Sequence, residues 1–312
     1  MIAAVFPGQG SQVPGMGKDL FDSFAEARDV FERVSAATSI DVQKLCFDTE
    51  EDVLRQTQNA QIALFTCSVA AWKVLKSQAN LMVTAVAGHS VGEYAALAAA
   101  DVISIEDGAR LVQIRGNLMN ESGKVQPGTM AAVLGLSRED LDVACASVEG
   151  VVVVANDNCP GQLVISGEVE AVKLAGEAAS AKGAKRVLPL NVSGAFHSPL
   201  MEEPAKKMGE ALSKVEFKAG SCEVYSNVTS EPVTDASQWP ALLEAQLKSP
   251  VRWTESTQNM RRDSIDTFIE CGVGEVLSGL LRRIDKEATG LKVNDSASLQ
   301  NTITALEGKT GA

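Results

Sequence analysis

Histidine is scarce in this chain of 312 residues, which contains only His89 and His197. A site that needs a histidine base therefore has two candidates. The six cysteines, at positions 46, 67, 145, 159, 222 and 271, form no Cys-x-x-Cys pair and have no histidine cluster beside them. This spacing argues against a zinc site and against a disulfide framework. It predicts free thiols in a reducing cytoplasm.

Long apolar runs and leader-like segments are also lacking. Residues such as His89 and Glu93 interrupt the most apolar stretches, so we expect no membrane span. The chain starts with a strand-like segment, residues 2–6, and we expect neither a signal peptide nor a transit peptide. The net charge of −12 argues against a general nucleic-acid or anionic-membrane binder. A hydrophobic content of 45% is that of a globular protein with a large core.

The most informative stretch is GHSVG at residues 88–92. Residues 83–87 before it are typical of a buried strand, and residues 93–100 after it are typical of a helix. Strand, sharp turn and helix are the context of a nucleophile elbow, where flanking glycines leave room for a strained serine. Ser90 would stand at the amino end of the helix, where the N–H of Val91 favours negative charge on a reacting acyl oxygen. The string also fits a Gly-Ser turn without chemistry.

The two histidines differ in how they could serve Ser90. His89 is adjacent to the serine, and at a tight turn its ring leaves the backbone in another direction. His197 lies in a loop between a predicted strand and a helix that begins near Pro199, where catalytic side chains are commonly carried. A neutral imidazole there can accept the serine proton and return it to a leaving thiol. We therefore predict His197 as the base; the alternative is a histidine that only bonds a loop carbonyl.

A glycine-rich turn, residues 7–12, connects the first predicted strand to a helix predicted over residues 17–36. Such a turn can cradle a phosphate, so a dinucleotide site is one interpretation. The third glycine is missing at the required spacing, and no second strand ends in an acidic residue about twenty positions on. Bare backbone N–H groups in this turn also suit the second half of an oxyanion hole, with Gln9 as the donor.

One arginine is predicted to lie among apolar residues. A helix expected from about residue 105 to 121 places Leu111, Arg115 and Met119 at positions i, i+4 and i+8. A guanidinium placed there needs an anion, because a buried unpaired charge is costly. The anion could belong to a ligand or to one of the 40 acidic residues of the chain. Spacing alone favours the internal salt bridge.

The order of elements predicts an inserted domain. Between residues 129 and 190 the pattern is strand, helix, strand, strand, helix, strand, which is the ferredoxin-like order. An alternating α/β pattern resumes after His197. We therefore predict an α/β fold with a large catalytic domain of residues 1–126 and 196–312 and a small domain of residues 127–195.

Five strings resemble the malonyl-CoA:acyl carrier protein transacylase family. They are VFPGQGSQ at the start, GHSVGEY around Ser90, the Arg-Gly at Arg115, AFHSPLM around His197 and QLKSPVRW after Ala245. They occur in this order across nearly the whole chain. The resemblance implies an α/β hydrolase-like large domain with a ferredoxin-like small domain.

The resemblance also implies roles, carried over by position. Ser90 matches the nucleophile and His197 its base, while Gln246 matches the glutamine whose main chain orients that histidine. Gln9 and Val91 match the N–H donors of the oxyanion hole. The matched substrate-binding positions are Arg115, Met119, Met130, Asn158 and Phe196.

Two of these positions imply the choice of acyl group. Arg115 matches the arginine that grips the free malonyl carboxylate. Phe196 matches the phenylalanine that accompanies malonyl rather than methylmalonyl choice in related polyketide acyltransferases.

The implied reaction transfers malonyl from malonyl-CoA to the phosphopantetheine thiol of holo acyl carrier protein, by way of a malonyl-serine, for fatty acid synthesis. It implies a cytoplasmic enzyme with no bound cofactor or metal and with neither nucleic acid nor membrane as a partner. A polyketide-pathway acyltransferase, a long-chain acyltransferase and a non-enzymatic interaction protein are alternatives. A serine esterase or lipase is another, although it usually has an acidic triad residue before a histidine late in the chain.

Overall fold

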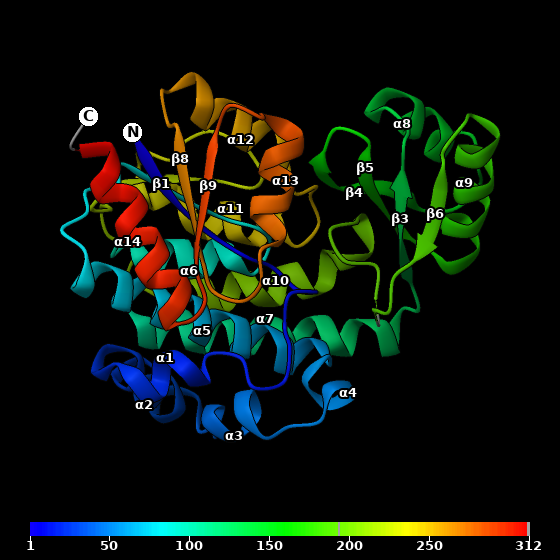
Figure 1. Ribbon diagram of the computed structural model, residues 1–312. Coiled ribbons are helices and arrows are strands. Elements are labelled where there is room, and N and C mark those ends of the chain that lie inside the picture. Colours follow the sequence, from blue (N-terminus) through cyan, green and yellow to red (C-terminus); the bar gives the residue numbers. More distant parts are fainter. Residues whose placement is uncertain (193, 311–312) are drawn as a thin grey trace.

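The larger part of the chain is built on a parallel β-sheet (Figure 1). The structure is a computed structural model and describes residues 1–192 and 194–310. In these described residues the sheet has five strands in the order β7-β2-β1-β8-β9, and each neighbouring pair is parallel. These strands are β1 (Ile2–Phe6), β2 (Ala85–Gly88), β7 (Glu223–Tyr225), β8 (Thr267–Cys271) and β9 (Thr289–Val293).

Both faces of this sheet are covered, and the side chains of its central strands alternate between two cores. Ala4 and Phe6 of β1 belong to the larger core, whereas Ala3 and Val5 belong to the core on the other face. Burial on both faces explains why β1 is a continuous apolar run rather than an alternating one.

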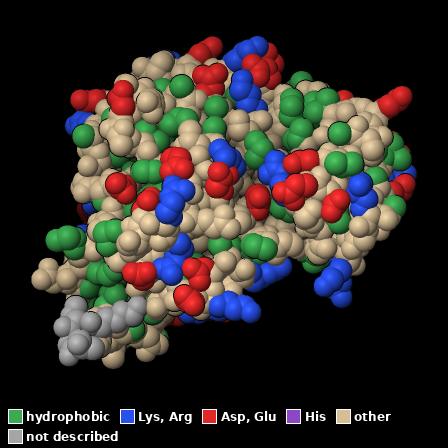
Figure 2. Space-filling view, turned by 90° about the horizontal axis from the view of Figure 1, so that it is seen from above, with side chains coloured by type: hydrophobic (Ala, Val, Ile, Leu, Met, Phe, Trp, Pro, Cys, Tyr) green, Lys and Arg blue, Asp and Glu red, His purple; other side chains and the backbone are tan. Residues whose placement is uncertain are grey.

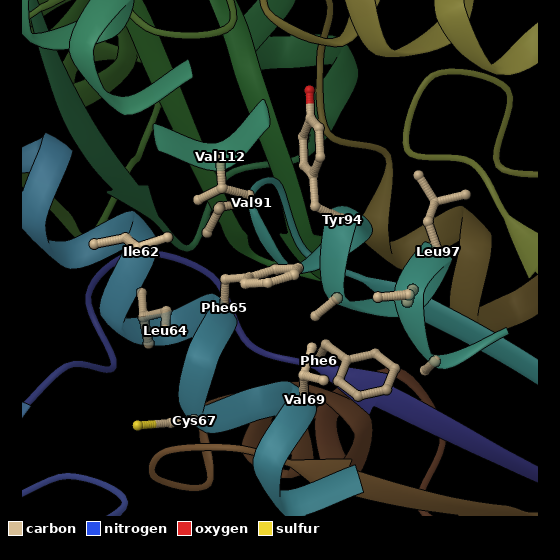
Figure 3. Close-up of a cluster of buried hydrophobic side chains, with 14 of the residues drawn as sticks. Phe6, Ile62, Leu64, Phe65, Cys67, Val69, Val91, Tyr94, Leu97 and Val112 are labelled. Carbon is tan, nitrogen blue, oxygen red and sulfur yellow. The ribbon is translucent and has the colours of Figure 1, made fainter. Parts of the chain in front are cut away.

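Three helices contribute many of the side chains of the larger core. They are α5 (Thr57–Gln78), α6 (Gly92–Ala99) and α7 (Ile105–Val125). Figure 3 shows side chains from these helices gathered around Phe6, whose ring also meets Trp72 edge-on at 6.3 Å between centroids. Val91, next to the elbow serine, belongs to the same cluster. The elbow is therefore anchored in the larger core.

Four short helices cover the outer side of α5 and α7: α1 (Lys18–Ser23), α2 (Ala25–Thr38), α3 (Val42–Phe47) and α4 (Glu51–Leu54). The prediction of a single helix over residues 17–36 was wrong, because this stretch forms the two helices α1 and α2. Phe24 is extended, with φ −128° and ψ 135°, and separates α1 from α2. The break lets Leu20 of α1 and Phe31 of α2 both reach the core. Because no glycine or proline marks it, helical periodicity alone could not show it.

The opposite face of the sheet is covered by α12 (Trp253–Arg262) and α13 (Val276–Ile284). Helix α10 (Glu202–Leu212) packs on α7 and on α11 (Trp239–Gln246), and α14 (Ser296–Thr310) packs on β9. Two 3₁₀ turns, Pro199–Met201 and Ala236–Gln238, lead into α10 and α11. No helix within the described ranges is both long enough and apolar enough to cross a membrane.

A second sheet lies beside the first (Figure 1). Its order is β4-β5-β3-β6, and all its pairs are antiparallel. Its elements are β3 (Thr129–Leu134), α8 (Arg138–Ala146), β4 (Val152–Cys159), β5 (Gln162–Gly167), α9 (Val169–Ala181) and β6 (Arg186–Pro189). This is the ferredoxin-like arrangement, so the predicted α/β fold class is confirmed. The boundaries of residues 127–195 stay a prediction.

Strand β4 of the second sheet bonds to the larger part of the chain near its end. Asn156 forms an isolated parallel bridge with Val251, and the N–H of Asp157 donates to the carbonyl of Val251 at 2.9 Å. The hydroxyl of Thr254 donates to the carbonyl of Asp157 at 3.2 Å. Strand β4 is thus hydrogen-bonded to the segment that follows Gln246.

Candidate active site

The turn at Ser90 has the strained geometry of an elbow. Its φ is +53°, in the left-handed region that non-glycine residues rarely adopt. A Cβ added at Gly88 would lie 1.9 Å from the carbonyl carbon of Gly92. A Cβ at Gly92 would lie 2.2 Å from the carbonyl oxygen of Phe6. Both glycines are therefore sterically required, as the sequence predicts.

His197 lies within hydrogen-bond distance of Ser90. The Oγ of Ser90 lies 2.8 Å from Nε2 of His197, and Nδ1 of His197 lies 2.8 Å from the backbone carbonyl oxygen of Gln246. Because a carbonyl oxygen only accepts, Nδ1 must carry the hydrogen, which leaves Nε2 free to accept the serine proton. The backbone N–H of His197 also donates to the carbonyl of Leu247 at 3.0 Å. A backbone carbonyl thus stands where a triad would have a carboxylate.

Arg115 on α7 is fully buried and reaches the same serine. Its Nη2 donates to Oγ of Ser90 at 3.0 Å and to Oε1 of Gln246 at 2.8 Å, and its Nη1 donates to Oε1 of Gln61 at 2.7 Å. Its Nε has no hydrogen-bond partner among the described residues, and no carboxylate in that part of the chain forms an ion pair with it. The internal salt bridge that spacing favours is not formed there.

The glycine-rich loop after β1 lies directly against the elbow. A Cβ at Gly8 would come within 2.7 Å of the carbonyl oxygen of His89, so only glycine permits this approach. The approach brings Gln9 to the wall of the cavity that Ser90 also lines. Val91 directly precedes α6, and its N–H finds no acceptor in residues 1–192 or 194–310. Both predicted oxyanion donors therefore lie beside the serine.

A cavity of about 340 Å³ opens over Ser90. Its walls contain seven of the ten predicted site residues, namely Gln9, Ser90, Met119, Met130, Asn158, Phe196 and His197. The other three, Val91, Arg115 and Gln246, are buried behind the wall. A larger cavity of about 780 Å³ lies along β7, and its lining contains none of the predicted site residues. Among the described residues, no group of three or more His, Cys, Asp or Glu side chains could hold a metal ion.

The second histidine is engaged elsewhere. Nε2 of His89 lies 2.8 Å from Oδ1 of Asn158, and its ring centroid lies 5.7 Å from that of Trp253. Asn158 belongs to β4, so this contact links the elbow to the second sheet. His89 supports the wall of the cavity and does not bond the hydroxyl of Ser90.

Burial and charge keep His197 neutral. Burial and, to a smaller extent, the positive charge of Arg115 lower its pKa to about 3, while the hydrogen bond to the carbonyl of Gln246 opposes this fall. Burial also lowers the pKa of His89. A neutral His197 can accept a proton throughout the physiological pH range.

Residues 4–305 match the family model described as the acyl transferase domain. The chain belongs to the acyl transferase family. It is 40% identical over 309 residues to the malonyl CoA-acyl carrier protein transacylase of Bacillus subtilis (strain 168), covering 98% of this chain and 97% of that relative.

Solved structures of the acyl transferase family agree with the fold. The acyl-carrier-protein-S-malonyltransferase of Bartonella henselae is 42% identical, with a TM-score of 0.94 over 98% of this chain and 99% of that one. A malonyl-transacylase solved in complex with its type II PKS acyl-carrier protein is 39% identical, with a TM-score of 0.94 over 97% and 99% of the two chains.

Sequence reasoning missed three polar residues of this acyl transferase site: Gln61, Glu93 and Asn227. Glu93 was visible as a lone carboxylate in the apolar helix α6, the same signal that singled out Arg115. Asn227 follows β7, whose neighbour β2 ends at the elbow. Only the strand order shows that the two strand ends are adjacent.

Proposed function

We propose that this acyl transferase moves a malonyl group from malonyl-CoA to the phosphopantetheine thiol of holo acyl carrier protein, supplying fatty acid synthesis. The observation that carries the proposal is that Oγ of Ser90 contacts both Nε2 of His197, at 2.8 Å, and Nη2 of Arg115, at 3.0 Å. A base and a buried cation on one hydroxyl suit an acyl donor that bears its own negative charge. The malonyl transacylase names of its relatives support the same reaction.

In the first step, Oγ of Ser90 bonds to the thioester carbon while its proton passes to Nε2 of His197. The backbone N–H groups of Gln9 and Val91 stabilise the negative charge on the former carbonyl oxygen. The carbon–sulfur bond then breaks, and His197 returns the proton to the sulfur. The products are coenzyme A and a malonyl ester on Ser90.

In the second step, the thiol of the carrier protein gives its proton to His197 and attacks the ester carbon. The bond between that carbon and Oγ of Ser90 breaks, and His197 returns the proton to Oγ. Acyl carrier protein leaves as its malonyl thioester, and the enzyme is restored. The mechanism is ping-pong and uses no metal or bound cofactor.

Arg115 holds the free carboxylate of the malonyl group in this proposal. Its guanidinium contacts the nucleophile, so the far end of a three-carbon acyl group on Ser90 is within its reach. Gln246 acts on both sides of the reaction: its main-chain carbonyl orients His197, and its side-chain oxygen accepts from Arg115. Met119, Met130, Asn158 and Phe196 form the walls around the acyl group.

Malonyl-CoA mixed with the wild-type enzyme should give a mass increase of one malonyl group, and peptide mapping should place it on Ser90. Ser90→Ala should give none, and added holo acyl carrier protein should remove the adduct from the wild type. Acetyl-CoA at the same concentration serves as the matched donor and should label much more slowly. A folded wild-type enzyme that stays unlabelled by malonyl-CoA would refute the proposed function.

The carrier protein needs a local cationic surface, because the enzyme itself has a net charge of −12. Figure 2 shows Lys and Arg interspersed with Asp and Glu on the face seen there. Arg283, on α13, contacts the turn between β4 and β5, since it donates to Oε1 of Gln162 at 2.7 Å and to the carbonyl of Pro160. We propose that docking uses three basic pairs: Lys185 and Arg186, Lys206 and Lys207, and Arg282 and Arg283.

Reversing the charge of Arg282 and Arg283 should raise KM for the carrier protein roughly tenfold and leave KM for malonyl-CoA unchanged. The pair of Lys206 and Lys207 should matter less, because Lys206 already bonds Glu203 at 2.9 Å. Lys18 and Lys44, on α1 and α3, give a control pair on the far helices. An unchanged KM for the carrier protein in all three reversed pairs would remove this surface from the proposal.

The remaining parts of the proposal concern organisation and location. We place the domain boundaries at residues 127–195 for the small domain and at 1–126 and 196–312 for the large one. The six cysteines, five of them buried, carry free thiols and suit a reducing cytoplasm. Nucleic acid and membranes are not partners in this proposal. A serine esterase is disfavoured because a carbonyl rather than a carboxylate bonds Nδ1 of His197.

A further inference from the structure

Glu93, one turn into α6 from the nucleophile, is a carboxylate with no exposed surface. Its Oε1 accepts from the backbone N–H of Asn227 at 2.6 Å, and its Oε2 accepts from Nε2 of Gln246. Neither donor is a cation. Burying a carboxylate that is bonded only by neutral N–H groups costs folding free energy. This cost suggests that Glu93 has a role in function rather than in stability.

Both partners of Glu93 hold the peptide groups of the elbow. Oδ1 of Asn227 accepts from the N–H of Ser90 at 2.7 Å, and Nδ2 of Asn227 donates to the carbonyl of Gly88 at 2.6 Å. Nε2 of Gln246 also donates to the carbonyl of Ser90, at 2.9 Å. The N–H and the C=O of the strained residue are therefore each fixed by the side chain of a residue that also bonds Glu93, Asn227 through its backbone N–H and Gln246 through its side-chain amide.

Gln246 also connects Glu93 to His197 and to Arg115. The main-chain carbonyl of Gln246 bonds Nδ1 of His197, and its side-chain oxygen accepts from Arg115. Because Glu93 accepts from the amide nitrogen of Gln246, the amide oxygen must face Arg115. The orientation of this amide thus follows from the carboxylate.

We propose, on the basis of the function proposed above, that Glu93 is a positioning residue. Through Asn227 it fixes Ser90 in its left-handed conformation, and through Gln246 it aligns the groups that bond His197 and Arg115. Glu93 does not line the cavity and touches no reacting atom. Its loss should therefore slow acylation far more than it weakens the binding of malonyl-CoA.

Burial raises the pKa of Glu93 to about 7, while the N–H groups of Asn227 and Gln246 and the charge of Arg115 oppose this rise. The charged and titratable side chains that face it, in the described part of the chain, are Arg115 on α7 and Tyr94 on α6. Protonation of Glu93 places an O–H group against the N–H of Asn227 or the amide N–H of Gln246, which then loses its acceptor. Acylation should then fall as the pH drops through about 7.

Glu93→Gln tests the role of the carboxylate. Glutamine keeps one acceptor oxygen, but its NH₂ group then faces either the N–H of Asn227 or the amide N–H of Gln246, and two donors cannot bond each other. Glu270→Gln is the matched control. Glu270 is also buried, at the end of β8, and accepts from the N–H groups of Leu277 and Ser278 and from the hydroxyl of Ser278, away from the cavity. Glu93→Asp, which keeps the charge but shortens the side chain, is the second variant should Glu93→Gln not fold.

Single-turnover acylation by malonyl-CoA, followed by rapid quench and intact mass, should be slowed roughly 10- to 100-fold in Glu93→Gln and in Glu93→Asp. KM for malonyl-CoA should stay within about twofold of wild type in both. The acidic limb of kcat/KM near pH 7 should be present in the wild type and in Glu270→Gln and absent in Glu93→Gln. Glu270→Gln should lose thermal stability but keep the wild-type acylation rate.

Two results would overturn the inference: folded Glu93 variants that acylate at the wild-type rate, or a limb near pH 7 that persists unchanged in Glu93→Gln. The proposed function fails on a different result, namely a wild-type enzyme that forms no malonyl-serine. The two failures are therefore distinguishable in one set of measurements.

Discussion

His197→Ala should lower the rate of acylation by malonyl-CoA about 10²- to 10⁴-fold. The substitution removes the only side chain that bonds Oγ of Ser90 as a proton acceptor within the described residues, because Nη2 of Arg115 can only donate. The rate of malonyl-serine formation at saturating malonyl-CoA is the measurement. Circular dichroism and the melting temperature should show that the variant is folded.

His89→Ala is the matched control, since it removes the other histidine of the chain. Its ring bonds Asn158 and packs near Trp253, so we expect a loss of stability and an altered cavity wall, with acylation largely kept. A folded His89→Ala that is as inactive as His197→Ala would show that the assignment of the base is wrong.

Arg115→Ala should collapse the preference for malonyl-CoA over acetyl-CoA. A bidentate contact between a guanidinium and a carboxylate in a dry site is worth about 2 to 4 kcal/mol, which corresponds to a roughly 30- to 1000-fold fall in the ratio of the two kcat/KM values. The slow transfer of acetyl groups should be kept or raised, because acetyl has no carboxylate to pair with the charge. The ratio is the informative quantity because any structural effect of losing the bonds to Gln61 and Gln246 acts on malonyl-CoA and acetyl-CoA alike and cancels in the ratio.

Arg115→Lys should restore the preference only in part, since an ammonium cannot form the two-pronged contact. Stability should also recover in part, because lysine restores a donor near the buried oxygens of Gln61 and Gln246. An unchanged malonyl-to-acetyl ratio in a folded, acylatable Arg115→Ala would place malonyl selection elsewhere in the cavity.

The elbow and the buried arginine could be predicted from the sequence because each leaves a pattern within a short stretch of the chain. The exclusion of a side chain at Gly88 comes from Gly92 and that at Gly92 from Phe6 on the neighbouring strand, but both glycines stand within one five-residue string. The burial of Arg115 follows from helical spacing, since Leu111 and Met119 on the same stripe are also buried. The ferredoxin-like order of short elements was equally visible in the chain.

The contacts between elements could not be predicted in the same way. Asn227 comes 137 positions after Ser90 and meets it only because β7 pairs with β2, which the sequence does not state. Glu93 reads as an isolated charge until Gln246, 153 positions away, is placed against it. The break at Phe24 depends on how α1 and α2 share a core rather than on a residue that disfavours helix.

The bridge between β4 and the segment after Gln246 limits how the inserted unit can be exchanged between relatives. A chimera that replaces residues 127–195 alone separates Asn156 and Asp157 from the Val251 and Thr254 with which they pair. The recipient segment that receives them is continuous with the carbonyl that bonds His197, so we expect a poor fit at Val251 or Thr254 to disturb the base as well. We therefore expect transplants of this unit to keep more activity when residues 247–254 come from the same donor, which places the useful crossover points outside residues 127–195.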